Sequence, residues 1–72
     1  MSRSVYQKEY RALLTRLRQA RLAAGLTQQR VAKLLRKPQS FVSKSELGER
    51  RLDPIELKRL AGVYGKPVDF FL

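Results

Sequence analysis

One side of a predicted short helix near the middle of the 72-residue chain carries four polar residues, Gln39, Ser40, Ser43 and Lys44. At about 100° per residue, they fall together with Leu47 within an arc of roughly 140°. Amide, hydroxyl and ammonium groups are the donors and acceptors that read base edges in a DNA groove. A solvated amphipathic helix gives a similar pattern, so the arc alone leaves both interpretations open.

Two short helices with a fixed break between them are predicted to position this arc. The first follows Thr27, whose hydroxyl can cap the first free amides, and its apolar stripe is Val31, Leu34 and Leu35. The second runs from about Pro38 to Leu47 and is closed by Gly48. Two helices joined by a turn of three or four residues describe a helix-turn-helix, which places its second helix in a DNA groove.

The other side of the second helix is predicted to face the rest of the domain, with Phe41, Val42, Ser45 and Glu46. A long first helix is expected from about Ser4 to Ala24, with Gly25 as its stop. Its apolar stripe comprises Tyr6, Tyr10, Leu13, Leu14, Leu17, Ala20 and Ala24. Its first turns are expected to project beyond the core, where Val5, Tyr6 and Tyr10 either touch a second subunit or form a frayed end.

The residue pattern in the last third of the chain predicts one more helix and a short turn. Asp53 is expected to cap this helix, Pro54 to occupy its first position and Gly65 to end it. Its buried face is predicted to be Leu57, Leu60, Ala61 and Tyr64. The apolar residues Phe70, Phe71 and Leu72 then either pack back on the core or belong to a subunit interface.

The net charge of +10 is distributed unevenly along the chain. Residues 1–45 contain eleven Lys and Arg and one acid, Glu9, whereas residues 46–72 contain five of each sign. This asymmetry indicates a polyanionic partner such as DNA, RNA or an acidic membrane surface. A basic surface with no assigned partner is the plainer alternative.

Composition excludes several other classes. The chain has no Cys and no His, which removes disulfides, the usual zinc ligands and the commonest general base, so we expect neither a metal site nor a cofactor nor an enzyme. No apolar run approaches the ~20 residues of a membrane span, and the N-terminus lacks the apolar core of a signal peptide. We therefore expect a cytoplasmic, nucleoid-associated protein with no membrane partner and no evident small-molecule substrate.

The span from about Leu17 to Leu72 resembles the lambda-repressor-like helix-turn-helix family, also called the XRE or Cro/CI type. The resemblance is carried, in the same order and spacing, by LRQAR and GLTQ, VAKLL (31–35), QSFVSKSE (39–46) and GERRLDPIELKRLA (48–61). It implies an all-α compact bundle of four to five short helices. With the extended N-terminal helix, residues 1–72 are then expected to form one DNA-binding domain.

The resemblance also implies roles for individual residues. Gln39, Ser40 and Lys44 match positions that reach bases, and Ser43 lies between them. The expected phosphate contacts are Thr27, Gln28, Lys37, Arg50 and Arg51. Arg21 and Glu46 match a pair that joins the first helix to the recognition helix.

Two residues depart from the family pattern. Family members usually have glycine near Arg36, where the chain leaves the first short helix, so this turn is expected to carry a small backbone cost. Ser45 stands where the family places a large apolar side chain, and a hydroxyl there forgoes about 1.5–3 kcal/mol of burial. We therefore expect Ser45 to weaken the hold on the recognition helix, and it could be an introduced change.

The function predicted from the sequence is sequence-specific binding of double-stranded DNA by a homodimeric transcriptional regulator on a palindromic site. An antitoxin-type or protein-interaction module with the same fold is the main alternative. An RNA binder would share the charge, but the chain lacks a basic sheet with stacking aromatics and a glycine-rich clamp loop. Membrane-surface binding by the first helix is a more distant alternative, because its aromatic residues are better explained as core.

Overall fold

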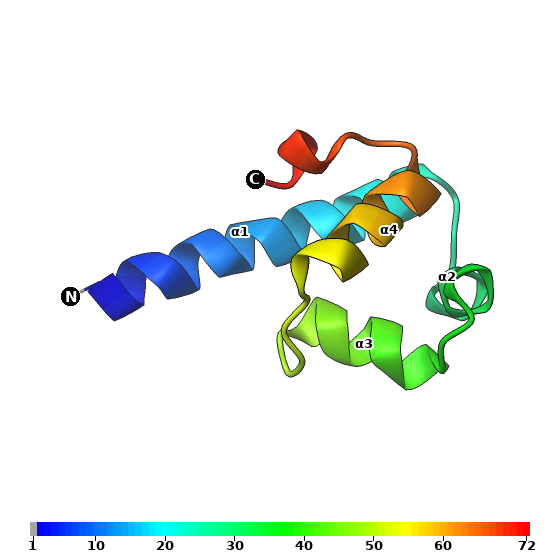
Figure 1. Cartoon of the computed structure of the whole chain (residues 1–72), viewed down its shortest axis with the longest axis horizontal. Coiled ribbons are helices and arrows are strands. Elements are labelled where there is room, and N and C mark those ends of the chain that lie inside the picture. Colours follow the sequence, from blue (N-terminus) through cyan, green and yellow to red (C-terminus); the bar gives the residue numbers. More distant parts are fainter. Residues whose placement is uncertain (1) are drawn as a thin grey trace.

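The fold consists of helices joined by short turns. In the computed structural model, which describes the backbone of residues 2–72 and the side chains of residues 7–72, the elements are α1 (Ser2–Ala23), α2 (Gln28–Leu35), α3 (Gln39–Leu47), α4 (Pro54–Tyr64) and a 3-10 turn, η1 (Val68–Phe70). In Figure 1, α4 overlaps α1 in the view, with α3 below them and the C-terminal turn above. Residues 2–72 contain no strand, which confirms the all-α prediction.

Helix α1 extends well past the other helices at its N-terminal end (Figure 1), as the sequence predicted. The side chains of Val5 and Tyr6, which were considered for a subunit contact, lie outside the described residues. At its other end Gly25, with φ of +72°, turns the chain out of the helix. Ala24 was predicted to be buried and is exposed, because the helix ends at Ala23 and its repeat no longer applies.

The predicted turn of three or four residues between the two short helices is residues 36–38, between α2 and α3. Thr27 caps α2, its Oγ1 accepting a hydrogen bond from the Arg30 amide at 3.1 Å. Pro38 was expected inside α3 but is its extended N-cap residue. The prediction that Leu34 is buried is wrong: its side chain is 48% exposed, and Ala32 takes its place in the core because α2 packs against both α3 and α4.

Helix α4 matches its predicted signals. Asp53 Oδ1 accepts from the Glu56 amide at 2.8 Å, while the Glu56 carboxylate accepts from the Asp53 amide at 3.0 Å, so the two residues form a capping box. All four residues predicted for its inner face are buried. In the C-terminal turn, Phe71 is buried in the core, whereas Phe70 and Leu72 stay exposed.

Gly48 ends α3 where the chain passes close to α1. Its φ is +82°, a conformation that L side chains rarely adopt, and a Cβ placed on it would lie 3.0 Å from Leu14 Cδ1 of α1. Glycine therefore allows the end of α3 to approach α1 closely. Among residues 7–72, the core that includes the inner side of α3 is formed by thirteen buried apolar side chains: Leu13, Leu17, Ala20, Val31, Ala32, Leu35, Phe41, Val42, Leu57, Leu60, Ala61, Tyr64 and Phe71.

Candidate nucleic-acid interface

The outward side of α3 presents the polar arc that the sequence predicted. Gln39, Ser40 and Lys44 are exposed, and Ser43 is half-buried. The Ser43 hydroxyl is 3.4 Å from the Ser40 carbonyl oxygen, which is long for a hydrogen bond of this type. The arc thus brings together an amide, two hydroxyls and an ammonium group on one accessible strip of helix.

The inward side of α3 is fixed by Phe41, Val42 and Ser45, which are all buried. Two cations also lie against the Phe41 ring. The Arg50 guanidinium carbon is 4.6 Å from the ring centroid and the Lys37 ammonium nitrogen is 5.3 Å from it. Both distances are within the range of cation–π attraction, so this ring links the residues before and after α3.

An ion pair holds α3 against α1. Arg21 Nε lies 2.6 Å from Glu46 Oε2 and its Nη2 lies 3.2 Å from Oε1, while Nη1 donates to the Leu26 carbonyl oxygen at 2.9 Å. Both side chains are about nine-tenths buried. The hydrogen bond to Glu46 raises the pKa of Arg21 above its ordinary value, so the guanidinium is charged at any working pH.

Gln28, at the start of α2, is part of the same network. Its Nε2 donates to Glu46 Oε1 at 3.0 Å, so one carboxylate ties together α1, α2 and α3. The sequence predicted a phosphate contact for Gln28 and did not anticipate this bond. The contact holds the Gln28 side chain against α3, next to Thr27, the other residue predicted to contact phosphate at this helix end.

A second ion pair closes the loop after α3. The Arg50 guanidinium donates to both carboxylate oxygens of Glu56, at 2.8 and 2.7 Å. These hydrogen bonds, with the one from the Asp53 amide, lower the pKa of Glu56 to about 2. Arg50 was predicted to contact phosphate, but in this structure its guanidinium is held by Glu56 and by the Phe41 ring.

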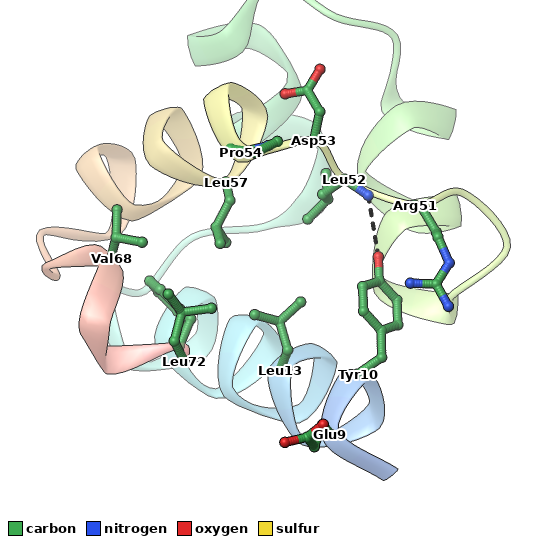
Figure 2. A pocket seen from close by; sticks show the side chains of 11 residues that line it. Glu9, Tyr10, Leu13, Arg51, Leu52, Asp53, Pro54, Leu57, Val68 and Leu72 are labelled. Atoms are coloured by element: carbon green, nitrogen blue, oxygen red, sulfur yellow. Dashed lines mark hydrogen bonds between the residues drawn. The ribbon is translucent and has the colours of Figure 1, made fainter. Parts of the chain in front are cut away.

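Arg51 has a different environment from Arg50. Its side chain is exposed, and its guanidinium carbon lies 4.5 Å from the centroid of the Tyr10 ring on α1. The Tyr10 hydroxyl oxygen in turn accepts from the Leu52 amide at 3.2 Å (Figure 2). The α1 helix therefore supports the loop from which Arg51 projects, and charge-assisted contacts of this arginine remain available to a partner.

The two departures from the family pattern both have a structural consequence. Arg36 caps α2 with φ of +58° and is the only residue other than glycine with positive φ in the described chain. Ser45 is 2% exposed and its Oγ has no hydrogen-bond partner among the protein groups. A left-handed non-glycine residue and an unpaired buried hydroxyl each carry a free-energy cost. The sequence predicted a backbone cost at Arg36 and a loss of apolar burial at Ser45, but not the unpaired hydroxyl.

The described surface of the chain is strongly basic. Two of the arginines in residues 7–72, Arg21 and Arg50, are engaged in ion pairs, and the other Lys and Arg side chains there are exposed. Within that same stretch, no three His, Cys, Asp or Glu side chains lie close enough to hold a metal ion. None of the described helices is long and apolar enough to cross a membrane.

Sequence reasoning missed the interactions that depend on neighbours distant in the chain. The clamp of Arg50 and Lys37 on Phe41, the bond from Gln28 to Glu46 and the bond from Leu52 to Tyr10 are the clearest cases. The ion pair of Arg50 with Glu56 was also missed, although a local signal existed, because the two residues flank the Asp53 cap with opposite charges. The bonds from Gln28 to Glu46 and from Leu52 to Tyr10 join residues 18 and 42 positions apart, and no local pattern predicts such pairs.

The comparisons with known proteins agree with this geometry. The family model described as Helix-turn-helix matches residues 17–71. A solved structure of an XRE-family like protein from Pseudomonas syringae pv. tomato str. DC3000 superposes with a TM-score of 0.91 at 42% identity, covering 99% of this chain and 89% of that one. No curated protein matches the chain. The chain belongs to the XRE family of helix-turn-helix proteins, whose domain is a DNA-binding fold of transcriptional regulators.

Proposed function

We propose that this chain is a sequence-specific DNA-binding transcriptional regulator that acts as a homodimer on a palindromic site. The observation that carries the proposal is the outward arc of α3, where Gln39, Ser40 and Lys44 are exposed on a helix whose other side is fixed in the core. An α-helix fits the major groove of B-DNA, and base edges there present donors and acceptors to such side chains.

The chemistry of each side chain suggests its target. A glutamine amide can donate to adenine N7 and accept from the adenine N6 amino group, so Gln39 suits an adenine. The Lys44 ammonium suits the O6 and N7 acceptors of guanine. The hydroxyls of Ser40 and Ser43 can donate or accept and so discriminate less strongly. Base preference is therefore expected to depend on Gln39 and Lys44 most.

Phosphate contacts would come from both ends of the helix-turn-helix. Thr27 and Gln28 lie at the N-terminus of α2, where the helix dipole favours an anion. Lys37 and Arg51 are exposed on either side of α3 and bring positive charge next to it. Arg50, bound to Glu56, would act chiefly by holding the loop that carries Arg51.

The small number of base contacts that one copy can make favours binding by two copies together. One short helix offers few bidentate contacts, each worth about 1–3 kcal/mol of discrimination, so a second recognition helix is needed for strong selectivity. A two-fold dimer would place the two α3 helices about 34 Å apart on a palindrome. Such a regulator would act in the cytoplasm, associated with the nucleoid.

The test is selection of bound sequences from a random duplex library by the purified full chain. The expected product is a palindrome with half-sites about one helical turn apart, and binding that falls with salt at a log–log slope near −5 if six phosphates are engaged. A duplex RNA of the same length serves as the competitor control. Unenriched sequences, a salt slope near zero or a preference for the RNA would each overturn the proposal.

A further inference from the structure

The peptide group between Arg51 and Leu52 is held on both of its edges. Its carbonyl oxygen, on Arg51, accepts a hydrogen bond from Arg50 Nη1 at 3.1 Å, and its N–H, on Leu52, donates to the Tyr10 hydroxyl oxygen at 3.2 Å. In a planar trans peptide the oxygen and the N–H point to opposite sides. The two bonds therefore restrain the rotation of this group where the Arg51 side chain leaves the backbone.

The Arg51 side chain contacts the same tyrosine a second time. Its guanidinium carbon lies over the Tyr10 ring at 4.5 Å from the centroid, within the range of cation–π attraction. None of the hydrogen bonds or ion pairs of residues 7–72 involves this guanidinium, so its N–H groups remain available to an anion. Tyr10 thus holds Arg51 through both its backbone and its side chain, and leaves the donors free.

The Tyr10 ring is a fixed support because it is anchored to the core. The side chain is half-buried and packs against the core cluster. It also lines an apolar groove of about 480 Å³ that is bordered by α1, the start of α4 and the C-terminal turn. In Figure 2, Tyr10 lies between Leu13, on the groove side, and Arg51.

A support of this kind favours binding of an anion by the arginine. A long side chain loses rotamer freedom when it binds, and a contact that restricts it beforehand reduces that loss. The neighbouring Arg50 is already paired with Glu56, so Arg51 supplies the unpaired cation of this loop.

We infer that Tyr10 is a positioning residue for DNA binding, which holds the Arg51 guanidinium in the orientation in which it contacts a backbone phosphate. The inference rests on the proposed function, because it explains how one of the phosphate contacts is set. Tyr10 acts through Arg51 and not by a contact of its own with DNA. Helix α1, which lies outside the helix-turn-helix, then contributes to affinity for every DNA sequence alike.

The experiment is a double-mutant cycle in the full chain. Dissociation constants are measured at one salt concentration for the parent, Tyr10→Leu, Arg51→Ala and the double variant, on the selected duplex and on a scrambled duplex of the same length. Tyr10→Leu is expected to weaken binding to both duplexes about threefold to tenfold. In the Arg51→Ala background the same change should alter affinity by at most about twofold. Equal losses in the two backgrounds would overturn the inference, because Tyr10 would then act independently of Arg51.

Two further variants serve as controls in the same assay. Tyr10→Phe keeps the ring and loses only the bond to Leu52, so its affinity should lie between those of the parent and Tyr10→Leu. Phe70→Leu removes another ring beneath a cation, with Lys66 Nζ at 4.9 Å from its centroid, and should leave affinity within about twofold. If Tyr10→Phe binds no better than Tyr10→Leu, or if Phe70→Leu loses as much, the role assigned to the Tyr10 ring is wrong.

A measurement without DNA separates this inference from the proposed function. Protons above an aromatic ring resonate upfield in NMR spectra, so the Arg51 δ-methylene protons of the free parent chain should be shifted upfield, and Tyr10→Leu should remove the shift. Identical Arg51 shifts in the two proteins would contradict the positioning by Tyr10 and leave DNA recognition intact. A shift that depends on Tyr10, together with no enriched duplex in the library selection, would contradict the proposed function alone.

Discussion

The two sides of α3 differ in how their polar groups are used. On the inward side, Glu46 is bound by Arg21 and Gln28, and the neighbouring apolar side chains are buried. On the outward side, the Gln39 and Lys44 side chains are exposed and belong to none of the hydrogen bonds or ion pairs of residues 7–72. One nine-residue helix therefore has an inward side that fixes its position and an outward side to which we assign DNA recognition, and changes to the two sides should affect different measurements.

Loss of the Glu46 carboxylate is expected to have the largest effect. In Glu46→Ala, Arg21 keeps a charge that is about nine-tenths buried and loses its partner, so the free energy of unfolding should fall by about 3–5 kcal/mol. Urea denaturation measures this change. Glu49→Ala, which removes an exposed carboxylate two residues beyond α3, is the control and should be nearly neutral. Equal losses in the two variants would mean that the ion pair does not anchor the helix.

Lys44→Ala tests the outward side. It is expected to reduce discrimination between the selected DNA site and a site altered at one base by about 1–3 kcal/mol, because a base contact is lost. Arg51→Ala should weaken binding to both sites alike. The stability of Lys44→Ala should stay within about 0.5 kcal/mol of the parent, since the side chain is exposed. A loss of stability equal to that of Glu46→Ala would end the distinction between the two sides.

Ser45 is the defect on the inward side, and its replacement should stabilise the protein. Ser45→Ala removes a buried hydroxyl that has no partner, and a gain of about 1 kcal/mol or more is expected from the recovered desolvation cost. Ser45→Ile should raise the melting temperature further if its extra atoms fit. Ser40→Ala, on the exposed side of the same helix, is the control and should change stability little. If neither Ser45 variant is more stable than the parent, the buried Ser45 hydroxyl does not destabilise the fold.

Arg36→Gly should give a smaller gain of about 0.5 kcal/mol. Glycine adopts the positive φ of this C-cap without the steric cost that a Cβ imposes, although it also adds freedom to the unfolded chain. The same replacement inside α2, Lys33→Gly, should instead destabilise by about 1 kcal/mol. Thermal denaturation of the two variants measures these opposite changes in stability. A loss of stability in both variants would contradict the backbone strain assigned to Arg36.

The smallest expected effect is a pH dependence from the loop that follows α3. Because the folded pKa of Glu56 is lowered to about 2, its pairing stabilises the fold above the unfolded pKa near 4.5, and that stability is lost as the pH falls toward 2. Glu56→Gln keeps a side chain able to complete the capping box but removes the charge. Its stability should therefore fall less than that of the parent between about pH 5 and pH 2. Parallel pH profiles would show that Glu56 contributes nothing through its charge.

Much of the architecture was predictable because its signals are local. Thr27 and Asp53 cap helices through hydrogen bonds to amides three residues away, and positive φ at Gly25 and Gly48 ends the preceding helices. The division of α3 into two sides follows from the helical repeat alone. The predictions that Ala24 and Leu34 are buried were wrong, because the helical repeat does not tell where a helix stops or which neighbouring elements cover its side chains.

By itself, the sequence determined the class of fold, the positions of the helices and the excess of positive charge, because each depends on residues within a few positions or on composition. The tertiary structure decided which polar side chains are engaged in hydrogen bonds, ion pairs or cation–π contacts and which stay free. It joined Glu46 to Gln28, bound Arg50 to Phe41 and Glu56 while leaving Arg51 exposed, and formed a groove from three separate segments. These features depend on contacts between distant residues, whose energies exist only after the helices have packed.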